Sequence, residues 1–247
     1  SVELPRGART QGKSGVRLLA IDTSSVACSV ALHLGSVVFE RHEEQPREHT
    51  RLLTPMIRTL LAEGRVDVAD LDAIVLGNGP GSFIGMRIAA SVAQGLAYGA
   101  NLAIVPVSSL AAVAAEVFAE TDTNTVIVAQ DAHMNEVYLG AYCRGDANNP
   151  DPLFAERLHG QALITELEGT DASGRIAAGF GWRRYPQLTA RNEALFESHS
   201  DVLYPRARYL LSLGAIALQN GHAVDPQDVA PAYLRDKVAE EPKPSGS

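Results

Sequence analysis

The sequence is short of cysteine, of positive charge and of long apolar runs, and each shortage excludes a class of protein. Its two cysteines, Cys28 and Cys143, lie far apart and form no CxxC motif. A disulfide framework or a zinc knuckle is therefore excluded, and a reducing, cytoplasmic environment is expected. The formal net charge of −8 argues against a stand-alone nucleic-acid binder, which normally carries a basic face. No apolar run reaches the roughly 20 residues that a membrane-spanning helix needs, so no membrane contact is expected.

Common catalytic motifs are also missing. The seven histidines show no HExxH or HxxxH spacing and no cluster with cysteine, so the sequence predicts no metal site. There is no GxSxG motif to present a nucleophilic serine. The glycine-rich stretch GPGSFIGMR, at 79–87, lacks the GK[ST] of a phosphate-binding P-loop. We therefore predict no catalytic residue.

The pattern of apolar residues predicts an α/β protein made of two similar halves. Strands are expected at 17–22, 26–34, 37–42, 73–76, 101–107, 125–131, 136–143, 154–158 and 176–180, and helices at 49–63, 83–98, 108–119, 162–167 and 207–219. One lobe is expected to span 17–108, with a returning helix at about 207–221, and the other 109–206. We expect residues 1–16 to form a flexible arm or an added leader, and 236–247 a tail.

The glycine turn at 77–81 joins an apolar strand to a helix that begins near Ser82. Backbone N–H groups at such a turn can face an anion, so Gly79, Gly81 and Ser82 are candidates for phosphate contact. Pro80 has no N–H to contribute. The alternative is a tight strand-to-helix connection, which the residues alone favour.

Two strand ends carry an aspartate, and both are candidate sites. Asp22 is followed by Thr23 and Ser24 at the first bend, and Asp131 ends a later strand. Such a bend can approach a nucleotide phosphate through its N–H groups, while the aspartate holds a metal-bound water. The alternative is that these residues only cap turns, which Asp, Thr and Ser often do.

The first two predicted helices differ in their surfaces. The helix at 49–63, with Thr50 as its expected N-cap, has a broad apolar stripe made of Leu52, Leu53, Met56, Ile57, Leu60 and Leu61. The helix at 83–98 has Ser91, Gly95 and Gly99 at steps of four, which allows another helix to approach closely. Packing within the domain and a partner surface both fit this pattern. Arg87, one turn into this helix, could bind an anion, meet a partner carboxylate or stay solvated.

Six segments occur in an order that marks a known family. They are LLAIDTSS at 18–25, HTRLLTPMI at 49–57, GNGPGSFIGMRIA at 77–89, VPVSSLAAVA at 105–114, DAHMNEVYLGAY at 131–142 and PAYLRDKVAE at 231–240. Together they resemble the TsaB (YeaZ) family of bacterial tRNA threonylcarbamoyladenosine biosynthesis proteins. The resemblance implies the actin-like ATPase fold of sugar kinases and Hsp70, with two lobes of duplicated mixed-sheet topology.

The resemblance implies a non-catalytic subunit. Such proteins pair with the related catalytic subunit TsaD and the small ATPase TsaE. The assembly transfers a threonylcarbamoyl group to N6 of the adenosine 3′ of the anticodon, in tRNAs that read codons starting with A. The catalytic relative has a metal-binding HxxxH where this chain has Ser109 and Val113. No cofactor of its own is therefore expected; ATP and the metal would belong to the complex, and tRNA would be met only through it.

The resemblance also implies a helix-pair interface with TsaD, or with a second copy when the protein is alone. Its expected contacts are Leu53, Met56, Ile57, Leu60, Met86, Arg87, Ser91 and Gly95. The usual GPGSFTGLR has Ile84 and Met86 here, and the usual DAR has His133, which weakens any nucleotide role. The alternatives are an ATP-dependent kinase of the actin-like fold and a metallopeptidase.

Overall fold

The fold is described from a computed structural model, which covers residues 15–230, 232 and 234. The tail predicted at 236–247 lies outside these residues, as does the N-terminal arm except for its last two positions. No helix in the described part of the chain is long and apolar enough to cross a membrane.

The first lobe is built on a five-stranded sheet with the order β3-β2-β1-β4-β5. Its strands are β1 (Arg17–Asp22), β2 (Cys28–Leu34), β3 (Val37–Glu43), β4 (Ala73–Gly77) and β5 (Ala103–Val107). The first three form an antiparallel meander, and β4 and β5 continue the sheet in parallel with β1. Because both faces of the sheet are covered, β4 is buried along its whole length and β1 is buried from its second residue.

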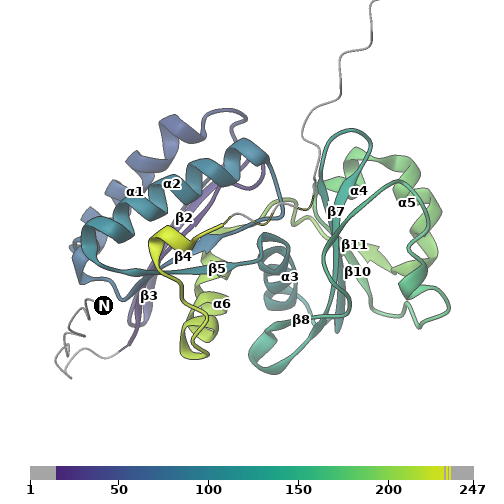
Figure 1. Cartoon of the computed structure of the whole chain (residues 1–247). Coiled ribbons are helices and arrows are strands. Elements are labelled where there is room, and N and C mark those ends of the chain that lie inside the picture. Colours follow the sequence, from purple (N-terminus) through teal and green to yellow (C-terminus); the bar gives the residue numbers. More distant parts are fainter. Residues whose placement is uncertain (1–14, 231, 233, 235–247) are drawn as a thin grey trace, which may run out of the picture.

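Helices cover the two faces of this sheet (Figure 1). On one side lie α1 (His49–Gly64) and α2 (Phe83–Ala100), and on the other α6 (Ala207–Gln219). Alternate residues of β1 enter the two cores: Leu19 and Ile21 pack with α1 and α2, and Leu18 packs with α6. The chain thus returns to the first lobe after completing the second.

The second lobe has a sheet with the order β11-β10-β6-β7-β8, and β9 also pairs with β7. Its strands are β6 (Thr125–Asp131), β7 (Val137–Arg144), β8 (Pro150–Pro152), β9 (Arg157–His159), β10 (Ile176–Ala178) and β11 (Ser198–His199). On one face lies α3 (Ser109–Glu120), and on the other lie α4 (Phe180–Arg184) and α5 (Pro186–Asn192). Because α3 also contacts α6, it joins the two lobes.

The two sheets repeat one plan. In each, a central strand (β1 or β6) pairs antiparallel with the next strand and parallel with a later one (β4 or β10), which a helix follows. This arrangement confirms the predicted α/β architecture of two related lobes.

Several local predictions were wrong. The N-cap of α1 is Glu48 rather than Thr50, because the Glu48 carbonyl accepts the first helical N–H bonds. Within α1, Pro55 lies in the second turn, on the exposed face of the helix. The helix predicted at 162–167 is only a 3₁₀ turn, Thr165–Leu167. Further 3₁₀ turns span Val68–Asp70, Asp146–Asn148, Glu193–Leu195 and Pro226–Asp228.

Candidate functional site

The Asp22 carboxylate, at the end of β1, is fully buried and fully used within the chain. One oxygen accepts hydrogen bonds from the Ser24 N–H (2.8 Å) and the Ser24 hydroxyl (2.7 Å). The other accepts from the Ser109 hydroxyl at the start of α3 (2.6 Å). Burial raises the pKa of Asp22, although these donors act in the opposite direction. Asp22 therefore joins its own bend to α3 and presents no free oxygen to a ligand.

The glycine turn after β4 packs directly against this bend. A Cβ on Gly77 would overlap the Asp22 carboxylate, and one on Gly81 would overlap Ser24. A Cβ on Gly85 would overlap the Thr23 carbonyl, and the Thr23 hydroxyl donates to the Gly85 carbonyl (2.7 Å). These glycines are required because two backbone segments meet here without room for side chains.

Two of the three N–H groups that could have bound an anion, those of Gly79 and Ser82, are donated within the protein. Ser82 N–H bonds to the Ser24 carbonyl (2.6 Å), and Gly79 N–H bonds to the Ser109 hydroxyl (3.1 Å). The Ser82 side chain caps α2 by accepting from Gly85 N–H (3.2 Å). Of the two interpretations of this turn, the structure favours the tight connection.

Asp131, at the end of β6, caps a turn. Its Oδ1 accepts from the His133 N–H (2.8 Å) and from the Tyr185 hydroxyl (2.7 Å). The next three residues after Ala132, from His133 to Asn135, have positive φ, which makes the turn sharp. Burial and the hydrogen bond to Asp131 raise the pKa of Tyr185 to about 12. Asp131 and Asp22 thus each hold their own turn.

The two positions expected to hold metal in the catalytic relative are packed into the protein. Ser109 is 1% exposed and donates to Asp22, and Val113 is fully buried in the core beneath α3. Within the described residues, no three His, Cys, Asp or Glu side chains converge as metal ligands. Ser109 therefore has a structural role in holding the bend.

More than half of the predicted interface residues lie in the core. Five of the eight are at most 7% exposed and lie inside the first lobe: Leu53, Met56, Ile57 and Leu60 of α1, and Met86 of α2. The wide stripe of α1 is thus used for folding. For these five residues the interface prediction requires correction, because they offer a partner almost no surface.

The remaining predicted residues share an exposed face of α2. Arg87, Ser91 and Gly95 are exposed, and a Cβ on Gly95 or Gly99 would meet no described atom within 4 Å. Arg87 lies over the Phe83 ring, 3.7 Å from its centre. No helix of the described chain uses the small-residue line, so packing within the domain is not its purpose.

Two large apolar side chains on this face were missed. Ile84 is 70% exposed and Tyr98 is 79% exposed, which is unusual for residues of this size. Both lie at helical spacing from Ser91 and Gly95, so the signal was present in the sequence. We call the set Ile84, Arg87, Ser91, Gly95, Tyr98 and Gly99 the open face of α2.

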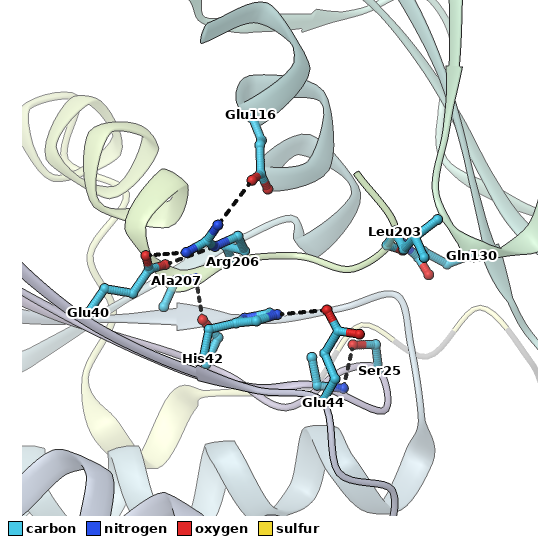
Figure 2. A network of polar contacts seen from close by, with 11 residues as sticks. Ser25, Glu40, His42, Glu44, Glu116, Gln130, Leu203, Arg206 and Ala207 are labelled. Atoms are coloured by element: carbon cyan, nitrogen blue, oxygen red, sulfur yellow. Dashed lines mark hydrogen bonds and ion pairs between the residues drawn. The ribbon is translucent and has the colours of Figure 1, made fainter. Parts of the chain in front are cut away.

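A polar network between the lobes was also missed (Figure 2). Arg206, just before α6, donates to Glu40 of β3 (Nη2 to Oε2, 2.6 Å) and lies 3.6 Å from Glu116 of α3. Burial and the nearby carboxylates of Glu120 and Glu40 outweigh Arg206 and raise the pKa of Glu116 to about 7. The three residues of this network, Glu40, Glu116 and Arg206, lie far apart in sequence and form no motif, so residue patterns could not reveal the network.

Comparisons with known proteins agree on one family. A family model described as "TsaD: tRNA N6-adenosine threonylcarbamoyltransferase" matches residues 36–159. The TsaB protein of Haemophilus influenzae is 35% identical, over 90% of this chain and 94% of the relative. The Escherichia coli TsaB is 34% identical, over 91% and 96% of the two chains. A solved structure of YeaZ from Pseudomonas aeruginosa, 35% identical, superposes with a TM-score of 0.82 and covers 89% of this chain and all of that one. These likenesses confirm the predicted actin-like, two-lobed fold.

Proposed function

This chain belongs to the TsaB family of tRNA threonylcarbamoyladenosine biosynthesis proteins, and we propose that it acts in that pathway as a non-catalytic subunit. In this proposal it supports a TsaD-like partner, which transfers the threonylcarbamoyl group to N6 of the adenosine 3′ of the anticodon. A TsaE-like ATPase completes the assembly, which works in the cytoplasm. ATP and any metal belong to these partners, and tRNA is met only through them.

The single observation that carries the proposal is the closed packing of the Asp22 bend against the glycine turn. A kinase of this fold needs a free aspartate and free N–H groups at this place, whereas here Asp22 and the N–H groups of Gly79 and Ser82 are committed within the chain. Ser109, at a position expected to bind metal in a catalytic relative, is one of the groups that hold Asp22. These contacts favour a structural role for the bend over catalysis.

The open face of α2 is the surface we assign to the partner. It combines two exposed apolar side chains with a line of small residues, so a second helix could approach its backbone closely. Arg87 adds a positive charge at the N-terminal end of this face. In the absence of a TsaD-like partner, we propose that the same face pairs two copies of this chain.

Reconstituted tRNA modification tests the proposal. TsaD, TsaE, threonylcarbamoyl-adenylate and unmodified tRNA are held constant, and modified adenosine is counted by mass spectrometry with and without this chain. Product is expected only when the chain is added, and the chain alone should form none. Equal product without the chain would overturn the proposal.

A pair of glycine variants tests the surface. Gly95→Arg places a long charged side chain on the open face of α2 and should abolish both partner binding and the gain in product. Gly160→Arg is the matched control, because a Cβ there also meets no described atom within 4 Å. It should behave like the wild type. Equal loss in both variants, or in neither, would contradict the assignment of this face.

A further inference from the structure

A pocket of about 230 Å³ lies between the two lobes, away from the Asp22 bend. His42 and Glu44 line it from the first lobe, and Glu116 and Glu120 line it from α3. The segment that precedes α6 contributes residues 201–204 and Arg206. In Figure 2, Glu116 points toward Arg206, and His42 points toward Glu44. Its volume is below that of drug-sized ligand pockets, so it suits a small molecule.

Negative charge is in excess around the pocket. Its lining contains the carboxylates of Glu44, Glu116, Glu120 and Asp201, but only Arg206 and His42 as basic groups. Arg206 is held mainly by Glu40, and Asp201 pairs with Arg183 outside the lining. His42 Nε2 lies 3.5 Å from Glu44. Glu120 has no recorded basic partner in the described chain, so the surplus falls on α3.

Two buried polar atoms at the pocket lack partners. Glu116 is only 4% exposed, and its Oε2 has no hydrogen-bond partner within the described chain. The Nδ1 atom of His42 is in the same condition. A buried carboxylate oxygen without a donor costs free energy, so most such atoms in folded proteins are satisfied. Glu116 is thus an acceptor without a donor, at the wall of an acidic pocket.

We propose that this pocket binds a small aliphatic amine, with its ammonium group bound to Glu116. An ammonium group has three donors and no acceptor, which complements the free Glu116 oxygen and the neighbouring Glu120 carboxylate. The lining also contains Val202, Leu203 and Tyr204, which suit the alkyl part of the ligand. The ring of Tyr204 can add a cation–π contact.

Other ligand classes fit less well. A divalent metal would need several converging ligands, and the described residues provide no such group of three. A phosphate or carboxylate ligand would face the surplus of negative charge. The chemistry therefore selects an organic cation.

Calorimetric titration with 1,4-diaminobutane at pH 8, where Glu116 with its pKa of about 7 is mostly ionised, tests this proposal on the purified full chain. The neutral analogue 1,4-butanediol and magnesium chloride serve as comparison ligands at constant ionic strength. We expect saturable binding of the diamine and none of the diol. Glu116→Gln should weaken binding about tenfold or more, because a charged hydrogen bond to the ammonium is lost. Glu168→Gln, an exposed carboxylate outside the pocket lining, is the matched control and should bind as the wild type does.

A second variant guards against a folding defect. Glu120→Gln changes an exposed residue at the rim and should weaken diamine binding several-fold without altering the fold. Absence of saturable binding, equal binding by the Glu116→Gln variant, or equal binding of magnesium would each overturn the proposal. No partner protein is present in this titration, so its outcome is independent of the reconstituted modification assay.

Discussion

Each lobe has an aspartate at the end of its central strand, but the two aspartates differ in how far their turns are buried. Asp22 ends β1 and is 1% exposed, enclosed by the glycine turn that follows β4. Asp131 ends β6, and its turn stays open: the side chain of His133 is 80% exposed, and Met134 is 47% exposed. Both central strands have an antiparallel neighbour on one side and a parallel neighbour on the other, so the order of the strands does not explain the difference.

The placement of glycine explains it. After β4, Gly77, Gly81 and Gly85 contact the bend itself, at residues 22–24. After β10, Gly179 and Gly181 contact Ala129, two residues before Asp131. In the first lobe the glycines therefore pack closely against the turn, whereas in the second lobe they pack against the strand before the turn. Whether the strand end is closed depends on where the small residues lie relative to it.

The largest expected effect comes from closing the space at Gly85. Gly85→Ala forces a Cβ against the Thr23 carbonyl, and overpacking of this kind should cost about 3 kcal/mol. The midpoint temperature of thermal unfolding should then fall by about 6–12 °C. Gly95→Ala, on the same helix but facing open space, is the control and should stabilise the protein by about 0.5–1 kcal/mol. A Gly85→Ala variant that melts like the wild type would show that the bend is not tightly packed.

The aspartates themselves test the contrast next. Asp22→Ala leaves the hydroxyls of Ser24 and Ser109 without their acceptor in a buried place, so it should cost about 2–3 kcal/mol. Asp131→Ala should cost about 1 kcal/mol, because the exposed His133 turn can bind water instead. Urea unfolding of the two variants measures both values. An equal or reversed order would mean that burial is not the cause of the difference.

The junction between the lobes adds a smaller, pH-dependent effect. The pKa of Glu116 is about 7 in the folded protein, against an ordinary value of 4.5, so the folded state binds the proton more tightly. The free energy of unfolding should therefore fall as pH rises from about 4.5 to about 7. Glu116→Gln removes this contribution, so over that range the free energy of unfolding of the variant should fall less than that of the wild type, by on the order of 1 kcal/mol.

Thermal unfolding at several pH values measures this effect. Burial also raises the pKa of Asp22, which adds its own pH dependence to the stability of both proteins. The difference between the wild type and Glu116→Gln therefore isolates the part that is due to Glu116. Parallel curves for the wild type and Glu116→Gln would contradict the role given to Glu116.

The strands and long helices could be predicted because their apolar periodicity is local. β1, β4, α2 and α3 were placed within two residues of their observed ends. The short helices α4 and α5 were missed, since each is held by tertiary packing of Trp182 and Leu188 more than by its own pattern. Element type thus follows from sequence where an element is long enough to show its period.

The site was less predictable, because the sequence cannot tell which side of an apolar stripe is covered. The stripe of α1 and the small-residue line of α2 were assigned to one interface, yet only the second is exposed. Glu40, Glu116 and Arg206 meet only after α6 returns to the first lobe. Contacts between distant segments of this kind leave no local spacing to detect.

The cysteines give the last contrast, with no expected effect on stability. Each lobe has one cysteine in the strand next to its central strand, Cys28 in β2 and Cys143 in β7. Burial raises the pKa of Cys28 to about 12, so at pH 8 only about one molecule in ten thousand carries the reactive thiolate. Cys143 is partly exposed and should react first with a thiol reagent. Mass spectrometry of the labelled peptides measures the order of reaction.

Cys28 should be labelled only when the first lobe opens, so its labelling in urea would report unfolding of the closed bend directly. Labelling of Cys28 at the rate of Cys143 under native conditions would contradict the tight packing of the first lobe.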